Sequence, residues 1–221
     1  MKKFLSNIKD ASNIHLHQGD LDGACTVYSL MMGLIIVVKD VTKKKLTSLD
    51  MDNDIDWRKS YGRLIKEFFY KRPQDDESPE TTLIRNGATL EQIQTKLAHS
   101  FSKKIQSYYA SSELEEDEDG YMDKYQLLEF IYKTIDNECP VEIAFKYRRG
   151  GGGHAVLAVG YEKQNGELNK IFCLDPGSDF KGHGRYNAVI DMTHNGKRIQ
   201  FHEQSNCTIE IYEALSFEVK S

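Results

Sequence analysis

The sequence predicts an α+β fold in which helices come first and an antiparallel sheet follows. Residues 24–38 are apolar almost throughout, as is typical of a buried central helix. Residues 54–110 place apolar side chains at three- and four-residue spacing, the period of an amphipathic helix. After Pro140 the chain changes to short β-type runs separated by turns. Helices and strands segregated in this way favour an α+β layout.

Composition limits the class of protein. The chain has 221 residues, of which 39% are hydrophobic and 29% charged, and these values suit one soluble globular domain. The net charge of -5 gives no reason to expect nucleic acid as a partner. The longest apolar run, residues 30–38, is too short to span a bilayer, and polar residues interrupt the N-terminus. We therefore expect a cytoplasmic protein, or an exported effector without a cleavable signal peptide.

Residues 1–221 are expected to form a single domain, which we divide into three segments. Residues 1–49 hold a polar lead-in and the central helix, 50–136 form a helical acidic insertion, and 137–221 form the sheet. Within the insertion, residues 89–92 match a capping box, and an apolar stripe follows it. The stripe consists of Ile93, Leu97, Phe101 and Ile105. A further helix is expected over residues 122–136, with four side chains facing inward: Tyr125, Leu128, Ile131 and Ile135.

The sheet is expected to have six strands. They are predicted over residues 141–147, 155–162, 170–174, 187–192, 198–202 and 208–219. Asn165-Gly166 is a hairpin signal between the second and third of these. Antiparallel strands joined by a hairpin bring the start of one beside the end of the other, so position 154 should lie near position 175.

Cys25 is the cysteine whose position suits chemistry. A thiol is a good nucleophile only as a thiolate, and a helix N-terminus or a neighbouring imidazolium lowers its pKa. Cys25 opens the central helix directly after a loop that contains Gly23. The other cysteines lie in apolar or strand-like contexts without CxxC spacing, so we expect buried free thiols. They are Cys139, Cys173 and Cys207.

His154 and Asp175 complete a catalytic pattern with Cys25. His154 follows four glycines, and of these Gly152 and Gly153 would let a substrate backbone approach closely. Asp175 ends the neighbouring strand and would accept a hydrogen bond from the imidazole, fixing its tautomer. A cysteine at a helix start and an Asp-Pro-Gly turn are each more often structural. The predicted register favours the functional interpretation.

Gln18 is the candidate for stabilising a transition state. Acyl transfer develops a negative charge on oxygen, which requires hydrogen-bond donors already aimed at it. The backbone N–H of Cys25 is one candidate donor and the side-chain amide of Gln18 is the other.

At these residues the chain resembles papain-like cysteine peptidases, in particular their compact bacterial C39-like branch. The resemblance rests on Gln18 with residues 23–25, on residues 152–161 and on residues 174–177, about a third of the chain. It implies a Cys-bearing helix packed on an antiparallel sheet that carries the histidine. It also implies that Gln18, Cys25, His154 and Asp175 act as oxyanion donor, nucleophile, base and orienter.

Two departures from the family pattern accompany the resemblance. Thr26 stands where the family usually has glycine, and the interval from Gln18 to Cys25 is one residue longer than usual. This longer interval would bring Asp20 or Asp22 nearer the oxyanion position, where a carboxylate is unfavourable. The identity of the second donor therefore stays open.

The expected function is that of a cysteine peptidase, a thiol hydrolase that cleaves peptide or isopeptide bonds through an acyl-enzyme. Two alternatives stay open: a deamidase or transglutaminase-type acyltransferase acting on a protein glutamine, and a catalytically inactive binding protein. The expected partner is a protein or peptide substrate, and the acidic insertion is a candidate surface for a further protein.

We expect no cofactor and no metal. Of the six histidines outside the triad, five are considered as ligands, and none of these shows zinc-site spacing. They are His15, His17, His183, His194 and His202. Of these, His15 and His17 are expected on the surface. The carboxylates of residues 113–120 lack the register of an EF-hand loop, so this stretch is expected to be a solvated loop.

Overall fold

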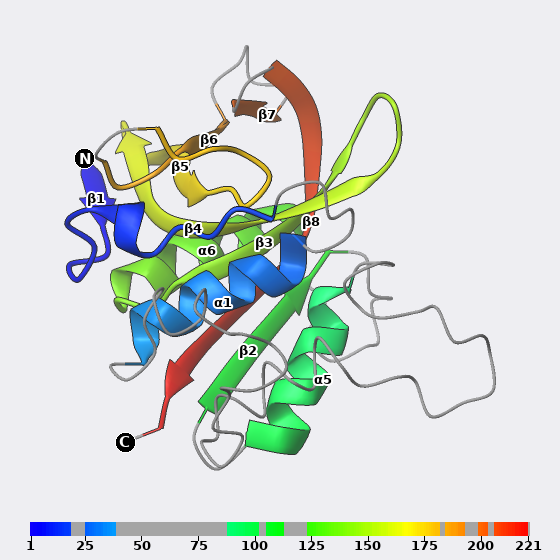
Figure 1. The fold of residues 1–221 in the computed structure, drawn as a ribbon. Helices are drawn as coiled ribbons and strands as arrows, with labels where there is room; N and C mark the ends of the chain where they lie inside the picture. The colour runs from blue at the N-terminus through cyan, green and yellow to red at the C-terminus, as the bar shows by residue number, and fades with distance from the viewer. Residues whose placement is uncertain are drawn as a thin grey trace.

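The computed structural model describes residues 1–18, 25–38, 88–101, 105–112, 123–181, 184–192, 199–202 and 206–220. The first four described elements are β1 (Lys2–Phe4), a 3₁₀ turn (Ala11–Asn13), α1 (Cys25–Val37) and α5 (Leu90–Phe101). They are followed by β2 (Ile105–Ser111), α6 (Lys124–Asp136), β3 (Val141–Tyr147), β4 (Gly153–Gln164), β5 (Glu167–Leu174), β6 (Ala188–Asp191), β7 (Ile199–His202) and β8 (Asn206–Val219) (Figure 1).

The described strands form one antiparallel sheet that closes on itself. Its order is β1-β4-β3-β8-β7-β6-β5, and β5 also pairs with β4. The six strands β3 to β8 therefore make a closed barrel, while β1 and β2 extend the sheet at β4 and β8. Register shifts between Ala158 and Gly160, and between Ala144 and Phe145, mark irregularities in the β4–β5 and β3–β8 pairings. Such bulges increase strand twist and help a sheet to curl.

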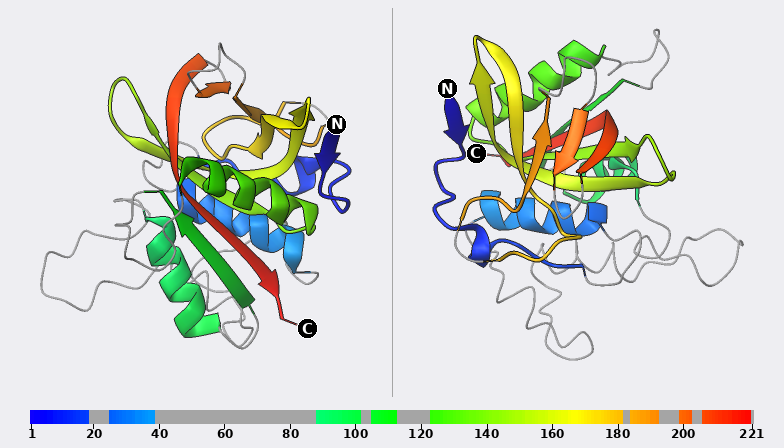
Figure 2. Two further views of the ribbon diagram at one scale, coloured as in Figure 1. Left: turned by 180° about the vertical axis from the view of Figure 1, so that it is seen from behind. Right: turned by 90° about the horizontal axis from the view of Figure 1, so that it is seen from above.

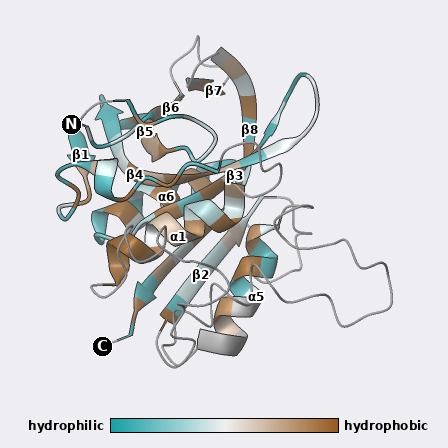
Figure 3. Cartoon of the chain, viewed as in Figure 1, coloured by the Kyte–Doolittle hydropathy of each residue, from teal (hydrophilic) through white to brown (hydrophobic). Residues whose placement is uncertain are grey.

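Two helices cover opposite sides of the long strands. Figure 2 shows α1 on one side and α6 on the other, and the contacts agree, since α1 packs on β4 and β3 while α6 packs on β4 and β8. The helix α5 packs against β2. Figure 3 shows hydrophobic colour along α1 and the neighbouring strands. The predicted buried central helix is thus confirmed, within one residue at each end.

Two predictions about secondary structure and one about burial were wrong. The N-terminal lead-in contains the strand β1 and buries Leu5 and Ile8, because β1 completes the edge of β4. The helix predicted to residue 110 ends at Phe101, and Ile105 begins β2, because pairing with β8 overrides the helical spacing. In α6, Tyr125 is 84% exposed, and Leu127 takes the inward position.

Several sequence predictions lie outside the described residues: the helical stripe within 54–87, the acidic loop 113–120, the turn at 194–197, and Gly23, Asp20, Asp22, His183 and His194. The predicted capping box is confirmed, because Thr89 and Gln92 exchange backbone-to-side-chain hydrogen bonds. Of the described helices, none is both long and apolar enough to cross a bilayer.

Candidate active site

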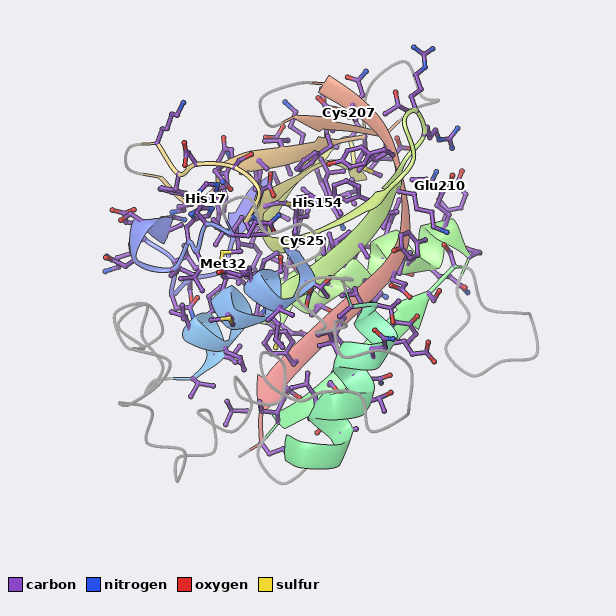
Figure 4. All side chains as sticks on the ribbon, turned by 45° about the vertical axis from the view of Figure 1, so that its right-hand side comes forward. His17, Cys25, Met32, His154, Cys207 and Glu210 are labelled. Carbon is purple, nitrogen blue, oxygen red and sulfur yellow. The ribbon has the colours of Figure 1, made fainter. Side chains whose placement is uncertain are left out.

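Close packing of α1 fixes the position of Cys25. A methyl group on Gly33 would lie 2.3 Å from the Phe217 ring of β8, so only glycine allows this helix to approach the sheet so closely. One turn after Cys25, the buried Ser29 hydroxyl donates to the carbonyl oxygen of Ala155 in β4, at 3.3 Å. Cys25 therefore begins the helix beside the first residues of β4, next to His154 (Figure 4).

Thr26 explains the first departure from the family pattern. Its side chain is buried, and the hydroxyl donates a hydrogen bond of 2.8 Å to the carbonyl oxygen of Ala88. The threonine therefore joins the first turn of α1 to the residues just before α5. A glycine at this position would lack that connection.

His154 enters the site from the start of β4. It pairs across the sheet with Phe145, whose ring meets the imidazole edge to face at a centroid distance of 5.6 Å. The centroid of the Phe201 ring lies 6.1 Å from that of the imidazole. These contacts restrict the orientation of the imidazole, and the side chain is only 12% exposed.

Asp175 holds the imidazole, as the predicted register required. Its Oδ1 lies 2.5 Å from His154 Nε2, and the carboxylate is fully buried. Gly177 N–H donates to Oδ1 and the Ser178 hydroxyl to Oδ2, each at 2.9 Å. Because Nε2 is engaged by Asp175, Nδ1 is the ring nitrogen left to face the thiol of Cys25.

The three side chains shift one another's pKa values. Burial raises the pKa of the Cys25 thiol, but the hydrogen bond and charge of His154 outweigh it, and the pKa is lowered. Burial alone would lower the pKa of His154, yet its hydrogen bonds to Asp175 and Cys25 raise it to about 10. Burial raises the pKa of Asp175, but the hydrogen bond and charge of His154 outweigh this effect, and the pKa is lowered. Opposite shifts of this kind favour a thiolate–imidazolium pair.

Gln18 lies beside the same loop. Its backbone N–H donates to the carbonyl oxygen of Pro176 at 2.9 Å, which ties the segment before α1 to the Asp175 turn. The side-chain Oε1 is buried and has no hydrogen-bond partner among the described residues. An unpaired buried polar atom costs about 1–3 kcal/mol. A rotation of the side-chain amide by about 180° would place its NH₂ group at the position of Oε1, where it would be a hydrogen-bond donor.

Three of the four glycines before His154, Gly150 to Gly152, have positive φ values. Gly152 has a φ of 87°, in the left-handed region, and its surroundings are open. Gly153 begins β4 opposite Lys146. Both residues are exposed, so the backbone next to His154 is accessible.

Sequence reasoning missed two polar residues that support Asp175. His15 was expected on the surface, but it is 3% exposed and its Nε2 lies 2.8 Å from the carbonyl oxygen of Asp175. Asn187 accepts the backbone N–H of Asp175 at 2.7 Å and donates to its carbonyl oxygen at 3.0 Å. His15 precedes the apparent motif, and Asn187 lies beyond it on the chain, so no local pattern marks either one. His17, by contrast, is 44% exposed, as expected.

Glu142 is a third unpredicted residue near the site. It pairs with Leu215 of β8, two residues from Phe217, and therefore faces α1. The side chain is fully buried, and neither carboxyl oxygen has a hydrogen-bond partner in the described part of the chain. Burial raises its pKa well above the usual range, and the charges of Cys25 and Glu213 act in the same direction. These effects all favour the neutral, protonated form of the carboxyl group.

The remaining thiols differ from Cys25. All four cysteines are free, but of the other three only Cys173 is fully buried, while Cys139 and Cys207 are partly exposed. Burial raises the pKa of Cys139 to about 11, which makes it a poor nucleophile at neutral pH. Within the described ranges no three His, Cys, Asp or Glu side chains are grouped to hold a metal ion.

No curated protein matches the chain. The model of the Peptidase C39-like family matches residues 12–205, a span that includes Gln18, Cys25, His154 and Asp175. This match covers most of the 221 residues. The chain therefore belongs to the Peptidase C39-like family, a family of cysteine peptidases with a papain-like fold.

Proposed function

We propose that the protein hydrolyses peptide or isopeptide bonds through an acyl-enzyme on Cys25, with His154 as acid and base and Asp175 as orienter. The observation that carries the proposal is the contact of the three side chains, with the thiol pKa lowered and the imidazole pKa raised. An ordinary buried cysteine shows the opposite shift, as Cys173 does.

The first half-reaction follows from the arrangement of these groups. The Cys25 thiolate attacks the scissile carbonyl carbon, and the carbonyl electrons move onto oxygen. The N–H of Cys25, at the N-terminal end of α1, and the amide of Gln18 are the proposed donors to this oxyanion. When the C–N bond breaks, the His154 imidazolium gives its proton to the leaving amine and becomes neutral.

The second half-reaction restores the site. Neutral His154 takes a proton from water as the water oxygen attacks the thioester carbon, and the C–S bond then breaks to release the acid and the thiolate. Throughout, Asp175 accepts from Nε2 and stabilises each imidazolium that forms. Removal of one oxyanion donor, by Gln18→Ala, should lower kcat by about 10²–10³.

A mass-spectrometric assay tests the proposal. A peptide mixture is incubated with the wild type, with Cys25→Ala and with the matched control Cys207→Ala, and samples are quenched in acid. We expect cleaved peptides and an acyl adduct on Cys25 in the wild type and the control, and neither in Cys25→Ala. Cleavage that persists without Cys25 would contradict the proposal.

The same assay separates the alternatives that share the first half-reaction. Release of ammonia with intact peptide backbones would identify a deamidase, and peptides joined to an added amine would identify an acyltransferase. The absence of all products and adducts, together with specific peptide binding, would indicate an inactive binding protein.

A further inference from the structure

The hairpin between β3 and β4 carries a concentration of positive charge directly before His154. Pairing continues to Lys146 opposite Gly153, and the N–H of Tyr147 donates to the carbonyl oxygen of Gly152 at 3.1 Å. Residues 148–151 form the tip, which arches away from the barrel (Figure 1). Three of the four residues 146–149 are basic in a chain with a net charge of -5. Figure 3 shows hydrophilic colour along this hairpin.

The two arginines of the tip are available for a ligand. Lys146, Arg148 and Arg149 are all exposed, but Lys146 Nζ lies over the Tyr212 ring at 4.7 Å. Arg148 has one ionic contact, 3.8 Å to Glu210 at the neighbouring end of β8, and both side chains are about half exposed (47% and 56%). An exposed pair of this kind contributes at most about 1 kcal/mol, so a substrate carboxylate can replace it. Arg149 has no ion pair with any described residue.

The backbone at the tip adds donors. Gly150, Gly151 and Gly152 all have φ between 70° and 91°, although a side chain at any of them would meet nothing within 4 Å. Chain conformation rather than lack of space therefore accounts for these glycines. The N–H groups of Arg149, Gly150 and Gly151 donate to no other described residue. Exposed amides beside two guanidinium groups suit a carboxylate.

Arg149 lies four residues after Phe145 of β3, which pairs with His154. At about 3.3 Å per residue, the tip is therefore at most roughly 13 Å from His154 along the hairpin. An extended peptide covers that distance with about four residues. A substrate bound at Cys25 can therefore reach the tip with a carboxylate a few residues from its scissile bond.

We infer that the tip of the β3–β4 hairpin, with Arg148, Arg149 and the backbone amides of residues 149–151, is a carboxylate-binding subsite that favours substrates with an acidic group three to five residues from the cleaved bond. The inference rests on the proposed peptidase function. The carboxylate belongs either to an acidic side chain or to the C-terminus of the substrate.

Paired peptides test the subsite. Fluorogenic peptides carry Glu or Gln at each of the positions three to five residues from the scissile bond, and a second pair ends in a free carboxylate or an amide. For the wild type we expect kcat/KM to be about three- to tenfold higher for the carboxylate member of at least one pair. The ratio should approach one in Arg148→Gln/Arg149→Gln, and it should fall as ionic strength rises.

A matched control removes an exposed positive charge elsewhere: Lys124→Gln at the start of α6, which should keep the wild-type ratio. A wild-type ratio near one for every pair, or a ratio unchanged in the double variant, would overturn the inference. If no peptide is cleaved, the proposed function fails separately. The subsite is then tested by fluorescence anisotropy with Cys25→Ala and with the triple variant Cys25→Ala/Arg148→Gln/Arg149→Gln. Cys25→Ala should bind the acidic peptides more tightly than their neutral partners. The triple variant should bind both with equal affinity.

Discussion

Replacing Glu142 by glutamine should change how the stability of the fold depends on pH. The carboxyl group is fully buried and has no hydrogen-bond partner among the described residues. Burial raises its folded-state pKa well above 4.5. Between pH 4.5 and that raised value, the unfolded chain loses the proton while the folded protein keeps it. The stabilisation that this residue provides at low pH is therefore lost as the pH rises.

The magnitude follows from proton linkage. Each pH unit in this window costs the folded state about 1.4 kcal/mol relative to the unfolded state. Glu142 should thus lower the free energy of unfolding progressively as the pH rises through this window. The variant Glu142→Gln has a similar shape and cannot ionise, so this contribution should disappear.

Urea unfolding at several pH values between about 5 and 8 measures the effect. The difference in free energy of unfolding between Glu142→Gln and the wild type should grow with pH by the slope above. The comparison is repeated in a Cys25→Ser background, because the thiol and Glu142 interact. Parallel pH profiles for the variant and the wild type would show that Glu142 titrates normally and would refute the reasoning.

Two further substitutions have defined outcomes. Asp175→Asn should lower the pKa of His154 and reduce kcat for peptide hydrolysis by about 10²–10⁴. The matched control Asp179→Asn, at a nearby exposed carboxylate, should leave kcat unchanged. Equal kcat values for the two variants would contradict the orienting role of Asp175. Gly160→Ala would place a methyl group 2.7 Å from the carbonyl oxygen of Lys3. It should destabilise the protein by about 1–3 kcal/mol and lower Tm by about 2–12 °C. A Tm equal to that of the wild type in calorimetry would show that β1 moves aside at no cost.

Local signals predicted the elements that bring the site together. The apolar helix begins at Cys25, and the Asn165-Gly166 turn set the register that places His154 beside Asp175. Both depend on short-range rules of helix burial and hairpin geometry, which a sequence displays directly.

Other features depend on long-range packing. Closure of the barrel requires β8 to pair with β3, a strand far away in the chain, and no periodicity within a strand encodes such a partner. The spacing of Ile105 continues a helical stripe, yet pairing with β8 makes it the start of a strand. His15 and Glu142 acquire their roles from neighbours far away in the chain, and their positions therefore could not be predicted.

The rate of Cys25 alkylation as a function of pH tests the central claim most directly. Iodoacetamide labelling is followed by mass spectrometry in the wild type and in His154→Ala, with Cys207 as an internal reference thiol. We predict that iodoacetamide labels Cys25 at pH values well below the pKa of an ordinary thiol, and that this low-pH reactivity disappears in His154→Ala. An ordinary thiol profile for Cys25, unchanged by the substitution, would contradict the thiolate–imidazolium pair and the catalytic role built on it.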